Sequence, residues 1–227
     1  MTRQLSRALL AEFLGSLLLT ALVIGSGIAA QRLSPGDRGL QLLENAAATA
    51  AGLYALILVF GPVSGAHFNP IVSFVDSALG GLPRRRALAY APVQVAGCVV
   101  GAVLANVLFE AAPVSISTTD RASWAHGVSE VVAALGLLLV IFSLLRTDRA
   151  QRVPAAVGAY IGAAYFFTSS TSFANPAITI GRVFSDTFAG IAPSSVPAFV
   201  LAQLAAGALS VPLLRFLYPP VASTEDP

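Results

Sequence analysis

Apolar residues fall in six long runs along the chain, and short polar segments separate them. The runs are Ala8–Ala30, Leu40–Phe60, Ala87–Phe109, Gly127–Leu145, Val153–Ser169 and Val196–Tyr218. In a helix that rises 1.5 Å per residue, about 20 residues cross a hydrocarbon core of about 30 Å. The pattern therefore predicts an all-α membrane protein with six transmembrane helices.

Two further apolar runs are only about half as long. Pro70–Leu79 follows the second long run, and Pro176–Phe184 follows the fifth. A helix of about ten residues reaches only halfway across the bilayer, so it must enter and leave on the same side. We therefore expect two re-entrant half-helices in addition to the six spans.

A shift of 106 residues superimposes one half of the chain on the other. The matches are Gly52 with Gly158, Tyr54 with Tyr160, Phe60 with Phe166, Ser64 with Ser170, and Asn69-Pro70 with Asn175-Pro176. Each copy holds three spans, and an odd number of spans makes the two copies insert with opposite topology. We predict a single domain over 1–227, built from inverted three-helix repeats at approximately 1–115 and 122–220.

Composition and charge place this chain in a lipid bilayer. Hydrophobic residues make up 56% of it and charged residues 11%, whereas a soluble domain carries about 25% charged residues. All 13 basic residues are Arg, and nine of them fall on one side of the predicted spans. Because basic loops stay inside, we expect both termini in the cytoplasm of a multi-pass inner (plasma) membrane protein. No basic stripe indicates a nucleic-acid partner.

The two Asn-Pro dipeptides begin the two half-helices. Asn is a favoured helix N-cap, and Pro is favoured at the first helical position. Half-helices that meet N-terminus to N-terminus place positive dipole ends at the midplane, which repels cations. If capping occupies each Asn carbonyl, the NH2 groups of Asn69 and Asn175 are left to donate into a pore. This arrangement is typical of a channel that passes small neutral solutes.

One carboxylate lies in the first helix of each repeat, Glu12 and Glu130. Burying a charge in a span is costly, so both should face the protein interior unless they lie close enough to the interface to reach water. A carboxylate has about four lone-pair sites, which suits it to accept the N–H groups of a re-entrant loop. We interpret Glu12 and Glu130 as braces of the two loops.

Three segments resemble the major intrinsic protein (aquaporin) family. They are Ala11-Glu12-Phe13, Gly65-Ala66-His67-Phe68-Asn69-Pro70 and Asn175-Pro176-Ala177. The resemblance extends over essentially the whole chain. It implies a right-handed aquaporin-like bundle of six helices and two half-helices, assembled as a homotetramer with one pore per subunit. The first box departs from the family at Ile71, where Ala is usual, and the bulkier Ile is expected beside the constriction.

The selectivity filter is where the chain departs most from the family. The resemblance places an Arg three residues after the second Asn, and this chain has Ile178 there. Counting along the family spacing gives Thr49, Ala163 and Ser172 as the other filter positions. These four residues predict a wide, uncharged filter with two hydroxyl groups.

Arg182 lies one helical turn beyond Ile178 and close in sequence to Asp186. We expect it at the external mouth, either as a charge that favours weak acids or oxyanions, or in a salt bridge to Asp186. His67, two residues before the first box, is expected in the pore vestibule as a structural or pore-lining residue rather than a catalyst. The stretch from Asn175 to Thr187 resembles a bacterial subgroup that lacks the filter Arg and is associated with arsenic resistance, which suggests arsenite or methylated arsenicals as solutes.

Other functions fit the sequence less well. An ordinary water or glycerol facilitator remains the main alternative. A secondary transporter would need ion-coordinating groups at the midplane, and a membrane-junction protein would need longer outer loops. No nucleophile or metal-ligand constellation indicates an enzyme, and we expect neither a cofactor nor a metal. The expected partners are small neutral solutes and the lipid bilayer.

Overall fold

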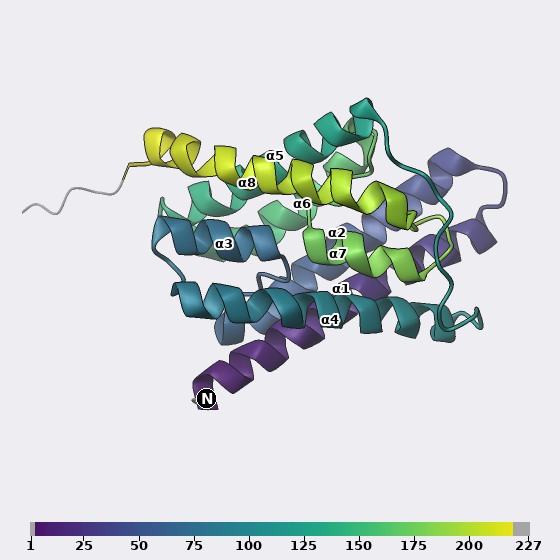
Figure 1. Cartoon of the computed structure of the whole chain (residues 1–227), viewed down its shortest axis with the longest axis horizontal. Coiled ribbons are helices and arrows are strands. Elements are labelled where there is room, and N and C mark those ends of the chain that lie inside the picture. Colours follow the sequence, from purple (N-terminus) through teal and green to yellow (C-terminus); the bar gives the residue numbers. More distant parts are fainter. Residues whose placement is uncertain (1–2, 220–227) are drawn as a thin grey trace, which may run out of the picture.

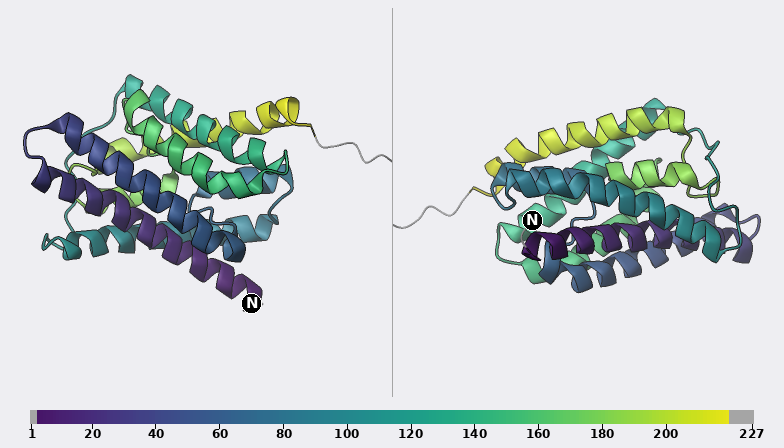
Figure 2. Two further views of the ribbon diagram at one scale, coloured as in Figure 1. Left: turned by 180° about the vertical axis from the view of Figure 1, so that it is seen from behind. Right: turned by 60° about the horizontal axis from the view of Figure 1, so that its bottom comes forward.

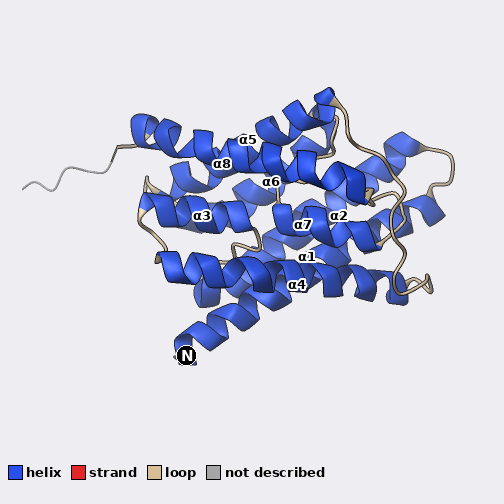
Figure 3. Ribbon diagram, viewed as in Figure 1, coloured by secondary structure: helices blue, strands red, loops and turns tan. Residues whose placement is uncertain are grey.

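The computed structural model describes residues 3–219, and all of the regular structure in this range is helical (Figures 1 and 3). The predicted domain ends at 1–2 and 220–227 lie outside the described residues. The long helices are α1 (Arg3–Leu33), α2 (Arg38–Ser64), α4 (Arg84–Leu108), α5 (Trp124–Leu145), α6 (Val153–Phe167) and α8 (Val196–Leu217). The short ones are α3 (Pro70–Leu79) and α7 (Pro176–Gly181).

Five of the long helices in the described part of the chain are long and apolar enough to cross a membrane. The sixth, α6, has 15 residues and rises about 22 Å. A 3-10 turn at Ala150–Arg152 leads directly into its first residue. The helix ends at Phe167, two residues before the predicted end, because Thr168 adopts an extended conformation. The Thr168 hydroxyl donates to the Ala164 carbonyl at 2.6 Å and caps this end.

The packing of the helices repeats between the two halves of the chain. In the first half α1 packs against α4, and in the second half α5 packs against α8. Helices α2 and α6 join the halves, while α7 of the second half packs on α4 of the first. The half-helices α3 and α7 lie end to end inside the bundle, with the long helices around them (Figures 1 and 2). This is the inverted repeat that the 106-residue shift predicts.

Two glycines on α4 allow it to approach α1 closely. A Cβ atom on Gly97 would lie 2.4 Å from the Phe13 carbonyl oxygen, and one on Gly101 would lie 2.2 Å from that of Leu17. Both distances are far below van der Waals contact, so no side chain fits at either position. Close backbone approach of this kind replaces the hydrophobic effect as the source of helix association in lipid.

The N-terminus, the loop between α3 and α4, and the end of α8 lie at the same end of the bundle (Figure 1). The loop that joins α4 to α5 and the residues between α7 and α8 lie at the opposite end (Figures 1 and 2). We call these the α3 end and the α7 end. The two half-helices therefore begin near the middle of the bundle and run outward toward opposite ends (Figure 1).

Candidate functional site

The loops that lead into the half-helices contain non-glycine residues in the left-handed conformation. Ala66 and Phe68 have φ values of 51° and 50°, and Ser172 and Ala174 have values of 52° and 49°. Each pair maps onto the other by the 106-residue shift. Such residues cost of order 1–3 kcal/mol each, so the surrounding structure must hold them in place.

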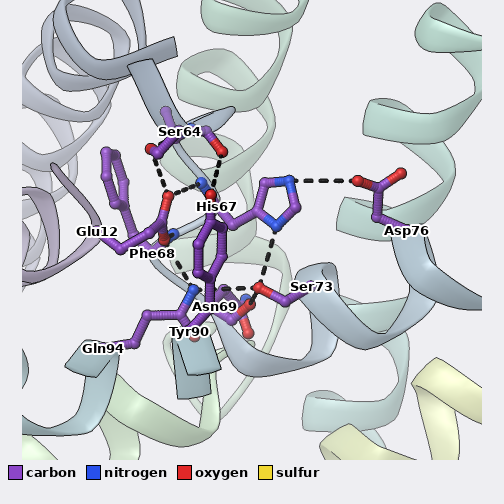
Figure 4. A network of polar contacts seen from close by, with 10 residues as sticks. Glu12, Ser64, His67, Phe68, Asn69, Ser73, Asp76, Tyr90 and Gln94 are labelled. Carbon is purple, nitrogen blue, oxygen red and sulfur yellow. Dashed lines mark hydrogen bonds and ion pairs between the residues drawn. The ribbon is translucent and has the colours of Figure 1, made fainter. Parts of the chain in front are cut away.

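Glu12 holds the first loop through both carboxylate oxygens (Figure 4). Oε1 accepts hydrogen bonds from the Ser64 hydroxyl at 2.6 Å and the His67 N–H at 3.0 Å. Oε2 accepts from the Phe68 N–H at 2.7 Å and from Gln94 Nε2 at 2.8 Å. The carboxylate is completely buried, and its four acceptor sites each have a donor.

Glu130 holds the second loop in the same way. Its Oε1 accepts from the Phe173 N–H at 2.9 Å, and its Oε2 accepts from the Ala174 N–H at 2.8 Å. Gln203 Nε2 donates to Oε2 at 2.6 Å. The two N–H donors, Phe173 and Ala174, are again 106 positions after His67 and Phe68, which donate to Glu12. Both carboxylates thus lie where a brace of the left-handed loop residues has to lie.

Gln94 and Gln203 belong to the hydrogen-bond networks around Glu12 and Glu130, and the sequence pattern did not predict them. Gln94 links Glu12 to the Ser73 hydroxyl at 3.1 Å, and Gln203 links Glu130 to the Thr179 hydroxyl at 3.0 Å. Both amides are completely buried in otherwise apolar helices, α4 and α8. A buried polar residue in an apolar span was the available signal, since such residues usually have a function.

The two Asn side chains bind the opposite loop as well as their own helix. Asn69 Oδ1 accepts from the Ile71 N–H at 3.1 Å, and its Nδ2 donates to the Ala174 carbonyl at 2.8 Å. Asn175 Oδ1 accepts from the Ala177 N–H at 2.9 Å, and its Nδ2 donates to the Phe68 carbonyl at 2.7 Å. The expectation that the whole NH2 group is free to face the pore is therefore corrected. One hydrogen of each amide ties the two loops together, and neither Nδ2 makes a second hydrogen bond to the residues that the structure describes.

A cavity of about 130 Å³ follows these loops through the bundle. Asn69 and Asn175 both line it, together with the loop residues on either side of them. Pro70, Ile71, Pro176 and Ala177 are buried but do not line it. Ile71 instead packs toward α8, where its Cβ lies near Gly207. The bulkier Ile71 that we expected beside the constriction therefore does not line the cavity.

Three of the four expected filter residues, Thr49, Ser172 and Ile178, line the cavity. Ala163 does not line it, because this side chain is exposed on the outside of α6. Tyr165, two residues later, is 3% exposed and lines the cavity in its place. The Tyr165 hydroxyl lies 3.2 Å from the Thr49 hydroxyl. An aromatic ring thus occupies the position at which we expected a methyl group.

His67 and Arg182 both line the cavity, toward the α3 end and the α7 end respectively. His67 Nδ1 lies 3.0 Å from the Ser73 hydroxyl, and Nε2 lies 3.5 Å from an Asp76 carboxylate oxygen (Figure 4). Arg182 is 2% exposed. It forms no salt bridge with Asp186, whose carboxylate accepts the Thr118 N–H at 2.9 Å instead.

The loop before α5 packs over the α7 end. Arg121 in this loop donates to the Gly190 and Phe188 carbonyls at 2.8 and 3.1 Å, and burial lowers the pKa of its guanidinium. The neighbouring Asp120 accepts the Ala122 N–H and the Ser195 hydroxyl, which together hold the pKa of its carboxyl below the usual value. These contacts fix the segment that packs against Arg182.

Across residues 3–219, no group of three metal-ligating side chains is present.

The comparisons with known proteins agree with this geometry. The major intrinsic protein family model matches residues 1–172, so the match ends just before the second Asn-Pro box. Aquaglyceroporin AqpS of Rhizobium meliloti (strain 1021) is 46% identical over 216 residues, which are 95% of this chain and 92% of that protein. Aquaporin NIP1-4 of Oryza sativa subsp. japonica is 32% identical over 179 residues, which are 76% of this chain and 64% of that protein.

The fold has a solved counterpart. The X-ray structure of the aquaglyceroporin from Plasmodium falciparum superimposes with a TM-score of 0.74 at 21% identity, over 95% of this chain and 96% of that one. This likeness confirms the predicted fold of six helices and two half-helices. The family match and the relatives confirm the resemblance noted in the sequence. The chain therefore belongs to the major intrinsic protein family, and it is an aquaglyceroporin-like membrane channel for small solutes rather than an enzyme.

Proposed function

We propose that this protein is a passive channel for small uncharged solutes and that its physiological solutes are arsenite or related metalloid and organoarsenical acids. Water and polyols are expected to permeate as well. The observation that carries the proposal is Ile178, which lines the cavity three residues after the second box Asn. An aliphatic side chain at this position leaves more room than an Arg and adds no fixed charge.

The residues around Ile178 support a solute with several hydroxyl groups. Thr49, Tyr165 and Ser172, which each carry a hydroxyl group, line the cavity together with the aliphatic Ile178. Hydroxyls donate and accept hydrogen bonds, so they can follow a solute that does both. Arsenite is a neutral trihydroxy molecule near pH 7 and matches this lining. Glycerol also matches it, so an ordinary water or glycerol facilitator is the alternative that an experiment must separate.

We further propose the setting in which this channel works. Nine of the 13 Arg residues fall on the side of the termini, which supports an inner-membrane protein with both termini in the cytoplasm. Many large apolar side chains on the outer surface of the subunit are exposed, among them Leu10, Leu58 and Phe166. Lipid covers such a surface in part, and a homotetramer with one pore per subunit would cover the rest.

The test is stopped-flow light scattering on proteoliposomes that compares water, glycerol and arsenite. The wild-type channel should pass arsenite at a rate comparable to glycerol. Ile178→Arg should lower arsenite and glycerol flux by about tenfold relative to water, which corresponds to a barrier increase of about 1.4 kcal/mol. Such a variant narrows the pore and places a second guanidinium close to Arg182.

Ile178→Val is the matched control, because it changes the same side chain without adding charge or length. It should leave the ratios of the three permeabilities unchanged. If Ile178→Arg also leaves these ratios unchanged, Ile178 is not part of the filter. If the wild-type protein passes water and glycerol but no arsenite, the ordinary facilitator is the correct function.

A further inference from the structure

Arg182 is a buried cation that the helix pattern alone does not place in the pore. It is the first residue of a 3-10 turn that continues α7, and its side chain lines the same cavity as Ser172 and Ile178. No ion pair of Arg182 is found among the residues that the structure describes. A charge that is 98% buried and has no opposite charge beside it is costly, so it calls for a function.

Two contacts fix the Arg182 guanidinium and leave its outer end unused. Its Cζ lies 3.4 Å from the centre of the Phe173 ring, and its Nε donates to the Ala189 carbonyl. Between residues 3 and 219, neither terminal nitrogen has a protein hydrogen-bond partner. Each terminal nitrogen carries two N–H groups. The side chain is therefore held rigidly while donors suited to an oxygen ligand remain available.

Ser172 provides an independent sign that the cavity receives a ligand here. Its side chain is 4% exposed and lines the cavity, and its hydroxyl oxygen has no hydrogen-bond partner within the described chain. A buried polar group without a partner is destabilising. Glu130, the carboxylate that braces this loop, makes its hydrogen bonds to Phe173, Ala174 and Gln203 and forms no ion pair with Arg182.

Arg121 is a second arginine beside the Phe173 ring, and its contacts differ from those of Arg182. Its guanidinium lies over the same Phe173 ring at 5.3 Å and donates only to loop carbonyls, those of Gly190 and Phe188. It does not line the cavity. Both arginines thus lie against the Phe173 ring, but of the two only Arg182 lines the cavity.

We propose that Arg182 is a specificity-determining residue of the channel, whose terminal N–H groups bind the oxygens of small oxyacids together with the Ser172 hydroxyl. The planar fork of a guanidinium matches two oxygens of one oxyacid group. The site accepts the singly charged oxyacid as well as the neutral one, since the bound anion neutralises the buried cation. This inference rests on the proposed channel function and extends its solutes from uncharged molecules to monoanionic oxyacids.

The experiment uses potassium methylphosphonate, a small oxyacid, with glycerol as the neutral reference. Uptake into proteoliposomes is followed with valinomycin present, so that potassium balances the charge. The wild-type channel should take up both solutes. Arg182→Gln should lower methylphosphonate uptake by about tenfold relative to glycerol, because one hydrogen bond to a charged group contributes enough for that factor. Arg182→Lys keeps the charge but loses the planar guanidinium. Its methylphosphonate uptake should lie between those of the wild type and Arg182→Gln.

Arg121→Gln is the matched control for misfolding or displacement of the loop before α5. It should reduce thermal stability without changing the methylphosphonate-to-glycerol ratio. An equal change of this ratio in Arg121→Gln and Arg182→Gln would overturn the inference, since the effect would then come from the loop. Glycerol flux without methylphosphonate uptake in the wild type would also overturn it while leaving the channel intact. Failure of water, glycerol and arsenite flux together would instead reject the proposed function.

Discussion

Replacing Glu12 by leucine should abolish solute flux and strongly destabilise the folded channel. The substitution removes the acceptor of three donors, the Ser64 hydroxyl and the His67 and Phe68 N–H groups, and it leaves Gln94 Nε2 only its bond to the Ser73 hydroxyl. Each orphaned donor costs about 1–3 kcal/mol. Relief from burying a carboxylate offsets only part of this cost, and the total is comparable to the stability of a typical fold.

The measurement is gel filtration of detergent-solubilised protein after heating, combined with water flux in proteoliposomes. We expect the melting temperature of Glu12→Leu to fall by roughly 10 °C or more. Glu12→Gln retains one oxygen acceptor, so its melting temperature should lie between those of the wild type and Glu12→Leu. Glu44→Gln is the control, because one oxygen of that carboxylate accepts only the Ser34 hydroxyl and the other has no partner within the described chain. Normal flux and stability in Glu12→Leu would show that the loop does not depend on this carboxylate.

Gly101→Ala should prevent α1 and α4 from packing and leave little folded protein. A helix normally gains about 1 kcal/mol when glycine becomes alanine. Here the new methyl group would lie 2.2 Å from the Leu17 carbonyl oxygen, which is backbone and cannot rotate away. Overpacking of this kind costs typically 1–3 kcal/mol or more, because the two helices have to separate.

The matched substitution is Gly127→Ala in α5, where nothing lies within 4 Å of the new methyl group. That variant should be as stable as the wild type or slightly more stable. Expression level and the monodisperse fraction in detergent compare the two proteins directly. If Gly101→Ala remains monodisperse with unchanged flux, the two helices do not depend on this close approach.

The half-helices show what the sequence could and could not predict. The bounds of α3 were predicted correctly, because an Asn-Pro pair begins the helix and Gly80 ends it in the left-handed conformation. The predicted helix Pro176–Phe184 is only partly α-helical, since α7 ends at Gly181 and a 3-10 turn covers Arg182–Phe184. Gly181 lies directly against the backbone of Cys98 in α4. This tertiary contact has no signature in the local sequence.

The filter shows why some site residues were found and one was not. Ser172 and Ile178 lie within three residues of Asn175, so the covalent chain limits how far they can be from the box. The α6 position had to be counted along a helix, where each residue turns by about 100°. An error of two residues therefore moves the choice from Tyr165, which faces the cavity, to Ala163 on the opposite face. Gln94 and Gln203 escaped notice because they are 109 residues apart, and the 106-residue shift does not align them.

The two bonds between the Asn side chains and the opposite loops also fix the order in which the pore can be assembled. The Asn69 amide needs the Ala174 carbonyl, and the Asn175 amide needs the Phe68 carbonyl. These partners are more than 100 residues apart, so the first loop enters the membrane long before its partner is synthesised. Neither repeat can complete its own half of the pore. The passage for solutes therefore cannot form before the second repeat has been inserted, and a chain that stops after its first repeat has none.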